Sequence, residues 1–393
     1  MNVVFVLLFV AALLAAAVHG DVKPVGAGAL EGAGNAVTLA IGLIGVMALW
    51  LGLLKIAEKS GLVDKLARAA RPVFRPLFQE VPEGHPAISA MLLNIAANML
   101  GLGNAATPFG IKAMEELEKL NPHPGTATNA QALFVAINTA SLQIVPTTVI
   151  ALRASAHSKD PAEILLPTLV ATSCALTVAI LAAKLLERAP VGRWLLVLAG
   201  LLGFVAVLAA VAVRWRAALE KGSSWFLAAI LVGIPLYGFF ERVKIYEAFV
   251  EGAKEGFQVA VRIIPYMVAI LAAVGAFRSA GAMDALGRLI GPVTSRLGLP
   301  PEVVPMAIVR PLSGGGALGI LGSIFATPGL GPDSYAGRLA SVLQGSTETT
   351  FYVLSVYCGS VGIVRYRHAL AAGLLADGAG LVASIVIARL VWG

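Results

Sequence analysis

Long stretches without a charged side chain set the strongest limit on what this chain can fold into. A helix needs about 20 mostly apolar residues to cross a hydrocarbon core of about 30 Å. Four stretches fit one crossing: Asn35–Leu54, Ile164–Ala183, Trp194–Val213 and Gly222–Phe240. Charged residues make up only 13% of the chain, against about a quarter in a soluble domain. The sequence therefore predicts an all-α, multi-pass protein of the cytoplasmic membrane.

The first apolar run, Val3–Val18, has two interpretations. The sequence Val18-His19-Gly20 resembles the cleavage site of a signal peptide. A signal peptide also requires a positively charged residue before its apolar run, and no Lys or Arg precedes this run. We therefore expect residues 1–20 to form a retained first helix.

Four other stretches are rich in Asn, Thr, Gly and Pro and do not look like simple crossings: Gly84–Ile111, Asn121–Leu152, Pro311–Pro332 and Thr349–Val364. Irregular backbone at membrane depth occurs only where it is buried in protein or lines a watery cavity. Broken helices of this kind form the binding sites of many transporters. We expect broken or re-entrant helices here, with loops outside the membrane as the alternative, and roughly eight to ten spans in all.

The chain also repeats itself. Lys59–Asp64 corresponds to Ser279–Asp284, and the pair Pro82-Glu83 corresponds to Pro301-Glu302. In each copy a Gly-rich run and a polar, hairpin-like segment follow. An ordered series of features that occurs twice indicates two related halves, which we expect to superpose through a pseudo-two-fold axis. Lys and Arg do not alternate between the loops, so the positive-inside rule leaves open whether the repeats are inverted or parallel.

Six motifs in these repeats carry a resemblance to known families: Gly42–Gly52, Asn98–Pro108, Pro146–Ala151, Gly252–Phe257, Arg310–Gly314 and Gln344–Thr350. Through them the first half resembles spore maturation protein A and the second resembles spore maturation protein B. Both are similar to the gate, or nucleoside-recognition, domains of B-type ferrous-iron transporters. The resemblance divides the chain into residues 1–190, a connecting segment at 191–222, and residues 223–393.

The resemblance implies a membrane protein with a transport-like core, linked in spore formers to spore maturation and core dehydration. It does not imply a particular substrate. A looser similarity connects Thr347-Glu348 with the Gln-Thr-Glu hairpin of concentrative nucleoside transporters.

The uncharged candidate site residues lie in the broken region of the first half. Amides and hydroxyls that are unpaired in lipid are costly, so they must bond to neighbouring helices or to a ligand. Both alternatives stay open, because polar side chains commonly hold membrane helices together and also line transporter sites. The candidates are Asn94, Asn98, Asn104, Thr107, Asn138, Ser141 and Thr147.

The second half adds ionisable candidates. Arg310 precedes the Gly-rich break, Glu348 lies in the hairpin-like segment, and Asp377 lies within the apolar run Ala369–Ala388. A charge at the bilayer centre costs at least about 2.5–3.5 kcal/mol, so it is normally paired and functional. We expect Arg310 to meet Glu348 directly or through one water, beside Ser313, Gln344, Ser346 and Thr347. Placement of these charges in water at the interface is the alternative.

Two functions fit these features. The first is a transporter or channel-like gate for a small polar or ionic solute, and the alternative is a membrane scaffold in envelope or spore assembly. The sequence has no Gly-x-Ser-x-Gly elbow, Walker loop or metal-spaced Cys pair, so we expect no enzyme, cofactor or metal site. The expected partners are the lipid bilayer and the solute. The sequence leaves open whether the chain forms a homo-oligomer. We expect no nucleic-acid partner, because the chain has no cluster of basic residues interleaved with aromatic residues.

Overall fold

The computed structural model describes residues 2–101, 106–214, 216–294 and 296–393. These residues form helices joined by short loops, and an isolated bridge between Thr126 and Arg365 is the one β-type pairing among them. The predicted all-α fold is confirmed.

Each half contains a series of helices in the same order. A long first helix is followed by an amphipathic helix, a broken pair, a 12-residue helix, a second break and a long last helix. In the first half these are α2 (Lys23–Lys59), α3 (Leu62–Phe74), the 3-10 turn η1 (Arg75–Leu77), α4 (Pro86–Met99), α5 (Ala106–Glu118), α6 (Asn129–Ala140), α7 (Thr147–Ser155) and α8 (Leu165–Leu186).

The second half follows the same plan after the connecting helices α9 (Trp194–Arg214) and α10 (Arg216–Phe240). Its helices are α11 (Ile245–Ser279), α12 (Ala282–Thr294), η3 (Pro301–Val303), α13 (Val304–Val309), α14 (Gly314–Ala326), α15 (Tyr335–Ser346), α16 (Thr350–Val353), the π-helix η4 (Leu354–Cys358) and α17 (Ala369–Trp392).

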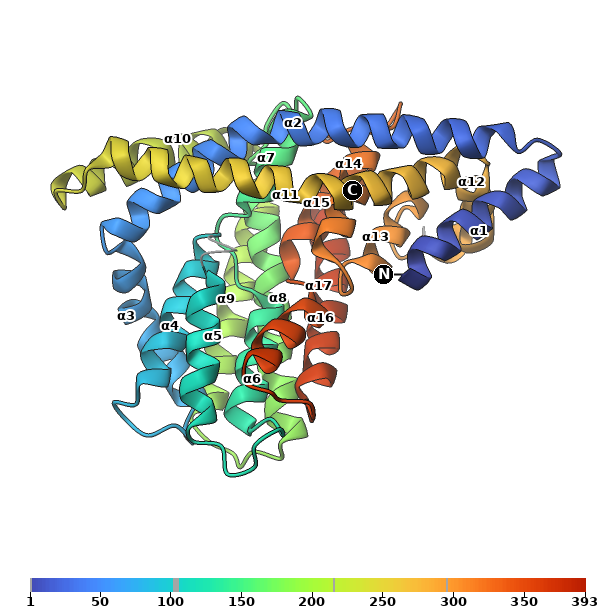
Figure 1. Ribbon diagram of the computed structural model, residues 1–393. Coiled ribbons are helices and arrows are strands. Elements are labelled where there is room, and N and C mark those ends of the chain that lie inside the picture. Colours follow the sequence, from blue (N-terminus) through green and yellow to red (C-terminus); the bar gives the residue numbers. More distant parts are fainter. Residues whose placement is uncertain (1, 102–105, 215, 295) are drawn as a thin grey trace.

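The first helices of the two repeats, α2 and α11, pack along each other and lie across one end of the bundle (Figure 1). Gly32 faces the carbonyl group of Leu271, and Gly252 faces the carbonyl group of Leu51. The repeat relates Gly32 to Gly252 and Leu51 to Leu271, so the two contacts are equivalent. Each contact joins the first part of one helix to the last part of the other, and α2 and α11 therefore run antiparallel. This is the arrangement that a pseudo-two-fold axis requires, and small residues let the two backbones approach closely.

The last helices of the repeats, α8 and α17, are also antiparallel neighbours. At one end, Glu163 just before α8 and Trp392 at the end of α17 both contact Arg338. At the other end, Lys184 in the last turn of α8 lies close to His368, which precedes α17. Because the equivalent helices run in opposite directions, the two repeats are inverted relative to each other.

Four helices of the described chain are long and apolar enough to cross a membrane: α2, α8, α9 and α17. Shorter apolar helical segments include Phe5–His19, Pro86–Met99, Ala228–Phe240, Met267–Ser279 and Gly314–Ala326. The first of these belongs to α1 (Asn2–His19), which packs Ala12 and Ala16 against α11 and α12.

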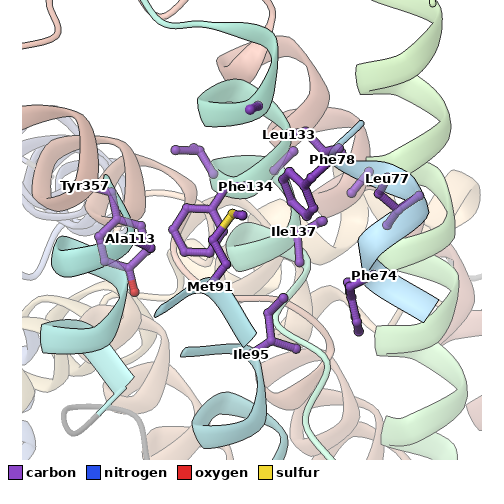
Figure 2. Packing of buried hydrophobic residues seen from close by; sticks show 14 of the residues in the cluster. Phe74, Leu77, Phe78, Met91, Ile95, Ala113, Leu133, Phe134, Ile137 and Tyr357 are labelled. Carbon is purple, nitrogen blue, oxygen red and sulfur yellow. The ribbon is translucent and has the colours of Figure 1, made fainter. Parts of the chain in front are cut away.

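The core joins the two halves rather than filling each one separately. Phe134 of α6 stacks on Tyr357 of η4, with ring centroids 5.8 Å apart, and Met91 and Ala113 lie against the same rings (Figure 2). Gly110 allows this contact, because a Cβ there would overlap the Tyr357 ring. The π-helix of the second repeat therefore packs inside the first.

The glycine contacts between α2 and α11 lead to a stability prediction. A Cβ at Gly32 would overlap the carbonyl group of Leu271, and a Cβ at Gly252 would overlap that of Leu51. Both obstacles are backbone, so G32A and G252A should each lower stability by about 1–3 kcal/mol, as overpacking does. The measurement is the thermal unfolding temperature in detergent.

The variant G34A is the matched control on α2. A Cβ added at Gly34 would meet no atom within 4 Å, and Ala favours a helix over Gly by up to about 1 kcal/mol. G34A should therefore leave the unfolding temperature unchanged or raise it. Equal losses in G32A and G34A would contradict the close contact.

Candidate functional site

A polar cavity of about 150 Å³ lies where broken segments of the two repeats meet. Its walls come from the break between α6 and α7, from the start of α14, and from the break between α15 and α16. An apolar cavity of similar size in another protein holds one benzene molecule. The lining residues are Gly101, Gln143, Pro146, Thr147, Thr148, Val149, Arg310, Gly314, Leu318, Gln344 and Glu348.

Local sequence explains both breaks. Helix α6 ends at Ser141, which has a left-handed φ of 41°, and Pro146 precedes the start of α7. Helix α15 ends at Thr347, whose backbone is extended at a φ of −145°. Proline lacks the amide hydrogen that a continuing helix needs. The carbonyl groups at these helix ends therefore need partners other than the next helical turn.

Arg310 supplies such partners in the second repeat. Its side chain is buried, at 4% exposure. Its Nε donates to the carbonyl oxygen of Gln344 at 3.2 Å, one terminal nitrogen donates to Thr349 Oγ1 at 3.1 Å, and the other donates to the carbonyl oxygen of Thr347. The guanidinium group therefore holds the unwound segment in place.

Arg310 and Glu348 approach each other as expected, since both line this cavity and the Glu348 charge acts on Arg310. No direct ion pair joins them among the described residues. The physical reason is that the unwound backbone offers Arg310 acceptors that would otherwise lack donors. Glu348 instead accepts from Gln143 Nε2 at 3.4 Å and from the Thr349 amide at 3.3 Å. Gln143 belongs to the first repeat, so the carboxylate group faces a side chain across the repeat boundary.

Three of the predicted asparagines form hydrogen bonds between helices. Asn94 Nδ2 donates to the carbonyl oxygen of Ala106 at 2.8 Å and to the Tyr357 hydroxyl group at 3.1 Å. Asn98 Nδ2 donates to Asn138 Oδ1 at 3.0 Å. For these residues the structure supports the alternative in which polar side chains hold the helices together.

The remaining predicted residues are spread around the breaks. Ser313 caps α14 by accepting from the Gly316 amide at 3.0 Å, and Ser346 Oγ donates to the carbonyl oxygen of Leu343 at 2.9 Å. Thr107 lies close to the Tyr357 hydroxyl group. Asn104 lies outside the described residues.

The cavity itself brings together four of the predicted residues, namely Thr147, Arg310, Gln344 and Glu348. Thr148, which belongs to the same polar break of the sequence as Thr147, also lines the cavity. Gln143 lines it too and was not among the candidates. Its position in the same charge-free, Pro-containing break as Ser141 and Thr147 was the signal that could have identified it.

The equivalent place in the first repeat is neutral and nearly closed. Both α6 and α15 have 12 residues, so Asn138 corresponds to Gln344, and Leu142 corresponds to Glu348. The void beside Asn138 and Leu142 measures only about 10 Å³. Inverted repeats have therefore produced one polar cavity with a carboxylate group and one apolar counterpart.

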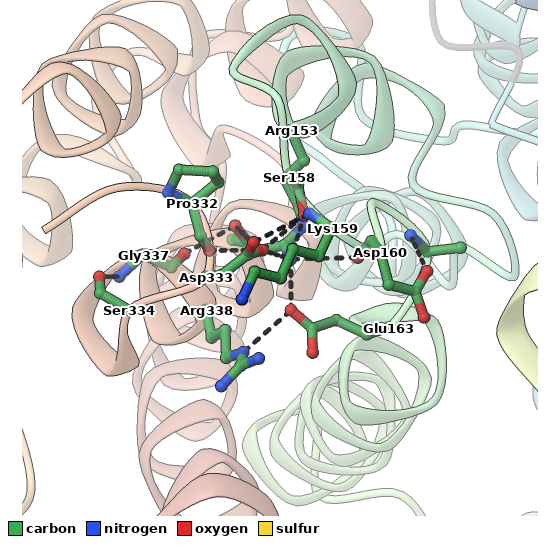
Figure 3. A network of polar contacts seen from close by, with 12 residues as sticks. Arg153, Ser158, Lys159, Asp160, Glu163, Pro332, Asp333, Ser334, Gly337 and Arg338 are labelled. Atoms are coloured by element: carbon green, nitrogen blue, oxygen red, sulfur yellow. Dashed lines mark hydrogen bonds and ion pairs between the residues drawn. The ribbon is translucent and has the colours of Figure 1, made fainter. Parts of the chain in front are cut away.

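A second polar network, which the sequence did not predict, joins the repeats near the end of α7 (Figure 3). Arg153 is fully buried. It donates to the carbonyl oxygen of Pro332 at 2.6 Å and forms ion pairs with Asp333, at 3.0 Å, and with Glu163. Glu163 also pairs with Arg338 at 2.9 Å. The network fixes the loop between α14 and α15 against the loop between α7 and α8 of the first repeat.

This network leads to a pH prediction through Asp333. Burial raises the pKa of its carboxyl group, but the Lys159 amide, the Ser158 hydroxyl group and Arg153 outweigh burial and hold that pKa below its ordinary value of 3.8. A lowered pKa stabilises the fold above the unfolded-state value and loses this effect as pH falls through the folded-state value. D333N should therefore cost about 1–3 kcal/mol at neutral pH, and the cost should disappear in acid.

The measurement compares unfolding temperatures of the wild type and D333N between neutral and acidic pH. E83Q is the control, because the side chain of Glu83 is 90% exposed. R153A should cost more than D333N, about 3–5 kcal/mol, because it removes a fully buried cation from two partly buried carboxylate groups and leaves Asp333 without its ion pair. A D333N deficit that stays constant down to strongly acidic pH would contradict the assignment.

Comparison with known proteins agrees with this two-repeat arrangement. The Gate family, described as nucleoside recognition, matches residues 40–156 and 260–364, one segment in each repeat. No solved structure matches the chain.

Two relatives from Bacillus subtilis (strain 168) each match less than half of the chain. Spore maturation protein B is 54% identical over 164 residues, which are 42% of this chain and 91% of the relative. Spore maturation protein A is 44% identical over 171 residues, which are 44% of this chain and 87% of the relative. Inner membrane protein YjiG of Escherichia coli (strain K12) is 32% identical over 89 residues, which are 22% of this chain and 58% of that protein.

The matched segments together cover more than half of the chain and coincide with the two inverted repeats. The chain therefore belongs to the Gate family of nucleoside-recognition proteins, as a multi-pass membrane protein that is related to both spore maturation protein A and spore maturation protein B.

Proposed function

We propose that the chain is a transporter or channel-like gate that carries a small polar solute through the cavity between its repeats. The observation that supports this most directly is the convergence of unwound segments from both repeats on one cavity that contains Glu348. In many transporters, broken helices at a repeat interface form the substrate site, and movement of one repeat against the other opens it to each side in turn.

The hydrogen bonds around the cavity favour a solute that is cationic or rich in donors. Arg310 directs three of its nitrogens to protein acceptors. The Glu348 carboxylate group, in contrast, accepts only two hydrogen bonds from the described residues, both at 3.3 Å or longer. Gln344 Oε1 also has no partner among the described residues. Among the groups left for a solute, the Glu348 carboxylate carries the charge and Gln344 Oε1 adds an acceptor, and both bind ammonium, amide or hydroxyl hydrogens.

The size of the cavity supports a small solute. A volume of about 150 Å³ accommodates a group of about benzene size and lies below the range of about 300–1,000 Å³ that is usual for drug-sized ligands. In this conformation the site fits a small amine, a partly hydrated cation or a single base better than a whole nucleoside.

The relatives suggest the physiological setting. The names of two of them refer to spore maturation, and that of a third refers to the inner membrane. We propose that this chain acts in the cytoplasmic membrane during spore maturation, by moving solute rather than by catalysing a reaction. A membrane scaffold for spore assembly is the competing function.

The proposal predicts that Glu348 determines solute binding. Purified protein in proteoliposomes should bind or take up members of a panel of small organic amines and metal ions, and organic acids should fail. E348Q keeps the size of the side chain but removes its charge, so affinity for a cationic solute should fall by at least tenfold, equivalent to about 1.4 kcal/mol. The measurements are thermal-shift titration and uptake of labelled solute.

Two controls make the result specific. In E115Q the altered side chain, on α5, is 49% exposed and lies outside the cavity, so binding should be unchanged. Q143L removes the cross-repeat partner of Glu348 and should weaken binding without a large loss of stability. Failure of every solute class to bind, together with normal spores from a strain that carries E348Q, would favour the scaffold.

A further inference from the structure

A second carboxyl group lies behind the cavity and is not used by the proposed solute site. Asp377 is in the membrane-spanning helix α17 and is 8% exposed. Its Oδ2 accepts a hydrogen bond from Thr350 Oγ1, and its Oδ1 has no partner among the described residues. A buried carboxylate oxygen without a donor is unusual, and inside a membrane helix it marks a functional group.

Helix α17 brings Asp377 against the same break that carries Glu348. Gly373, one turn earlier, lies against Thr139 and Thr350, and Gly380, about one turn later, lies against Ser346 and Thr347. The absence of side chains at these two glycines allows the close approach. Asp377 is therefore in contact with the unwound segment and not only with neighbouring helices.

Asp377 and Arg310 bond to residues of one short segment. Arg310 bonds to Thr347 and Thr349, Asp377 bonds to Thr350, and Glu348 lies between these residues in the chain. The charged groups that act on Asp377 are Arg310 and Glu348. Two hydroxyl-bearing residues of the second break, Thr347 and Thr350, also lie close to the Asp377 carboxyl group.

We propose that Asp377 is a proton-binding site coupled to the cavity through the segment 347–350. The carboxylate group takes a proton from hydronium, an O–H bond forms on the oxygen that has no donor, and water is released. Ionised Asp377 offsets the charge of Arg310. Protonated Asp377 leaves Arg310 balanced by Glu348 alone, which weakens the hold of Glu348 on a cation.

This geometry makes proton binding and cation binding mutually unfavourable. A cation beside Glu348 adds positive charge near Asp377 and favours its ionised form, so arrival of the solute should release the proton. This consequence rests on the proposed function, whereas the proton site itself does not.

Infrared spectroscopy of the full chain in lipid nanodiscs tests the proton site without any solute. A protonated carboxyl group has a C=O stretching band that a carboxylate group lacks. At mildly acidic pH, where ordinary carboxyl groups are ionised, wild-type protein should show this band, and the band should disappear as pH is raised further. D377N should lack it, whereas E348Q and the loop variant D333N should retain it.

Thr350→Val provides a second readout in case D377N does not fold. It removes the hydroxyl donor that favours the ionised form, so the midpoint at which the band disappears should move to higher pH. A band that persists in D377N, or a midpoint unaffected by Thr350→Val, would overturn the proposal. A third outcome would also overturn the proposal. If the carboxylate band of Asp377 changed when choline was replaced by sodium, and no protonated-carboxyl band was seen, the site would bind a metal cation in place of the proton.

The same experiment separates the two proposals. In one outcome, D377N lacks the band and the wild-type protein binds none of the solutes tested. This result would support the proton site and leave the solute site unsupported. Binding of a cation by a protein that shows no protonated-carboxyl band at mildly acidic pH would support the solute site and overturn the proton site.

Discussion

The structure depends on how unwound backbone is satisfied inside a protein that lipid surrounds. Lipid offers no hydrogen bonds, so each carbonyl group released at a helix break needs a donor from the protein. In the second repeat Arg310 supplies donors to Gln344 and Thr347. In the first repeat Thr172 Oγ1 lies within hydrogen-bond distance of the carbonyl oxygens of both Ala140 and Ser141.

The two breaks also support each other. The amide of Glu348 donates to the carbonyl oxygen of Thr139 at 2.7 Å, so the unwound segment of one repeat completes the helix end of the other. Each break is therefore satisfied partly by its own half and partly by the other half. The cavity exists at this place because the two unwound segments have to meet there, and its polarity follows from the side chains that satisfy them.

The sequence was sufficient for the plan of the fold and for part of the site. Charge-free runs predict the long helices, and the repeated Gly-rich and polar segments predict two related halves with broken helices. Arg310, Gln344 and Glu348 could be placed together because their motifs occupy the two breaks of the second repeat, which we expected to converge. The choice of carbonyl groups over Glu348 as partners of Arg310 could not be predicted, because backbone acceptors leave no mark in the sequence. The Arg153 network was missed because its partners Glu163 and Asp333 lie in loops of different repeats, and only the inverted packing brings them to one guanidinium group.

The antiparallel contact of α2 with α11 has a consequence for biosynthesis. A ribosome makes α2 early, but the helix that covers Gly32 carries Leu271 and emerges only after the first repeat and the two connecting helices are complete. During that interval the glycine face of α2 has no native partner, and contacts between residues far apart in sequence form slowly. Insertion factors or other small-residue helices would therefore compete for this face, and the yield of correctly assembled protein should depend on how long it stays uncovered.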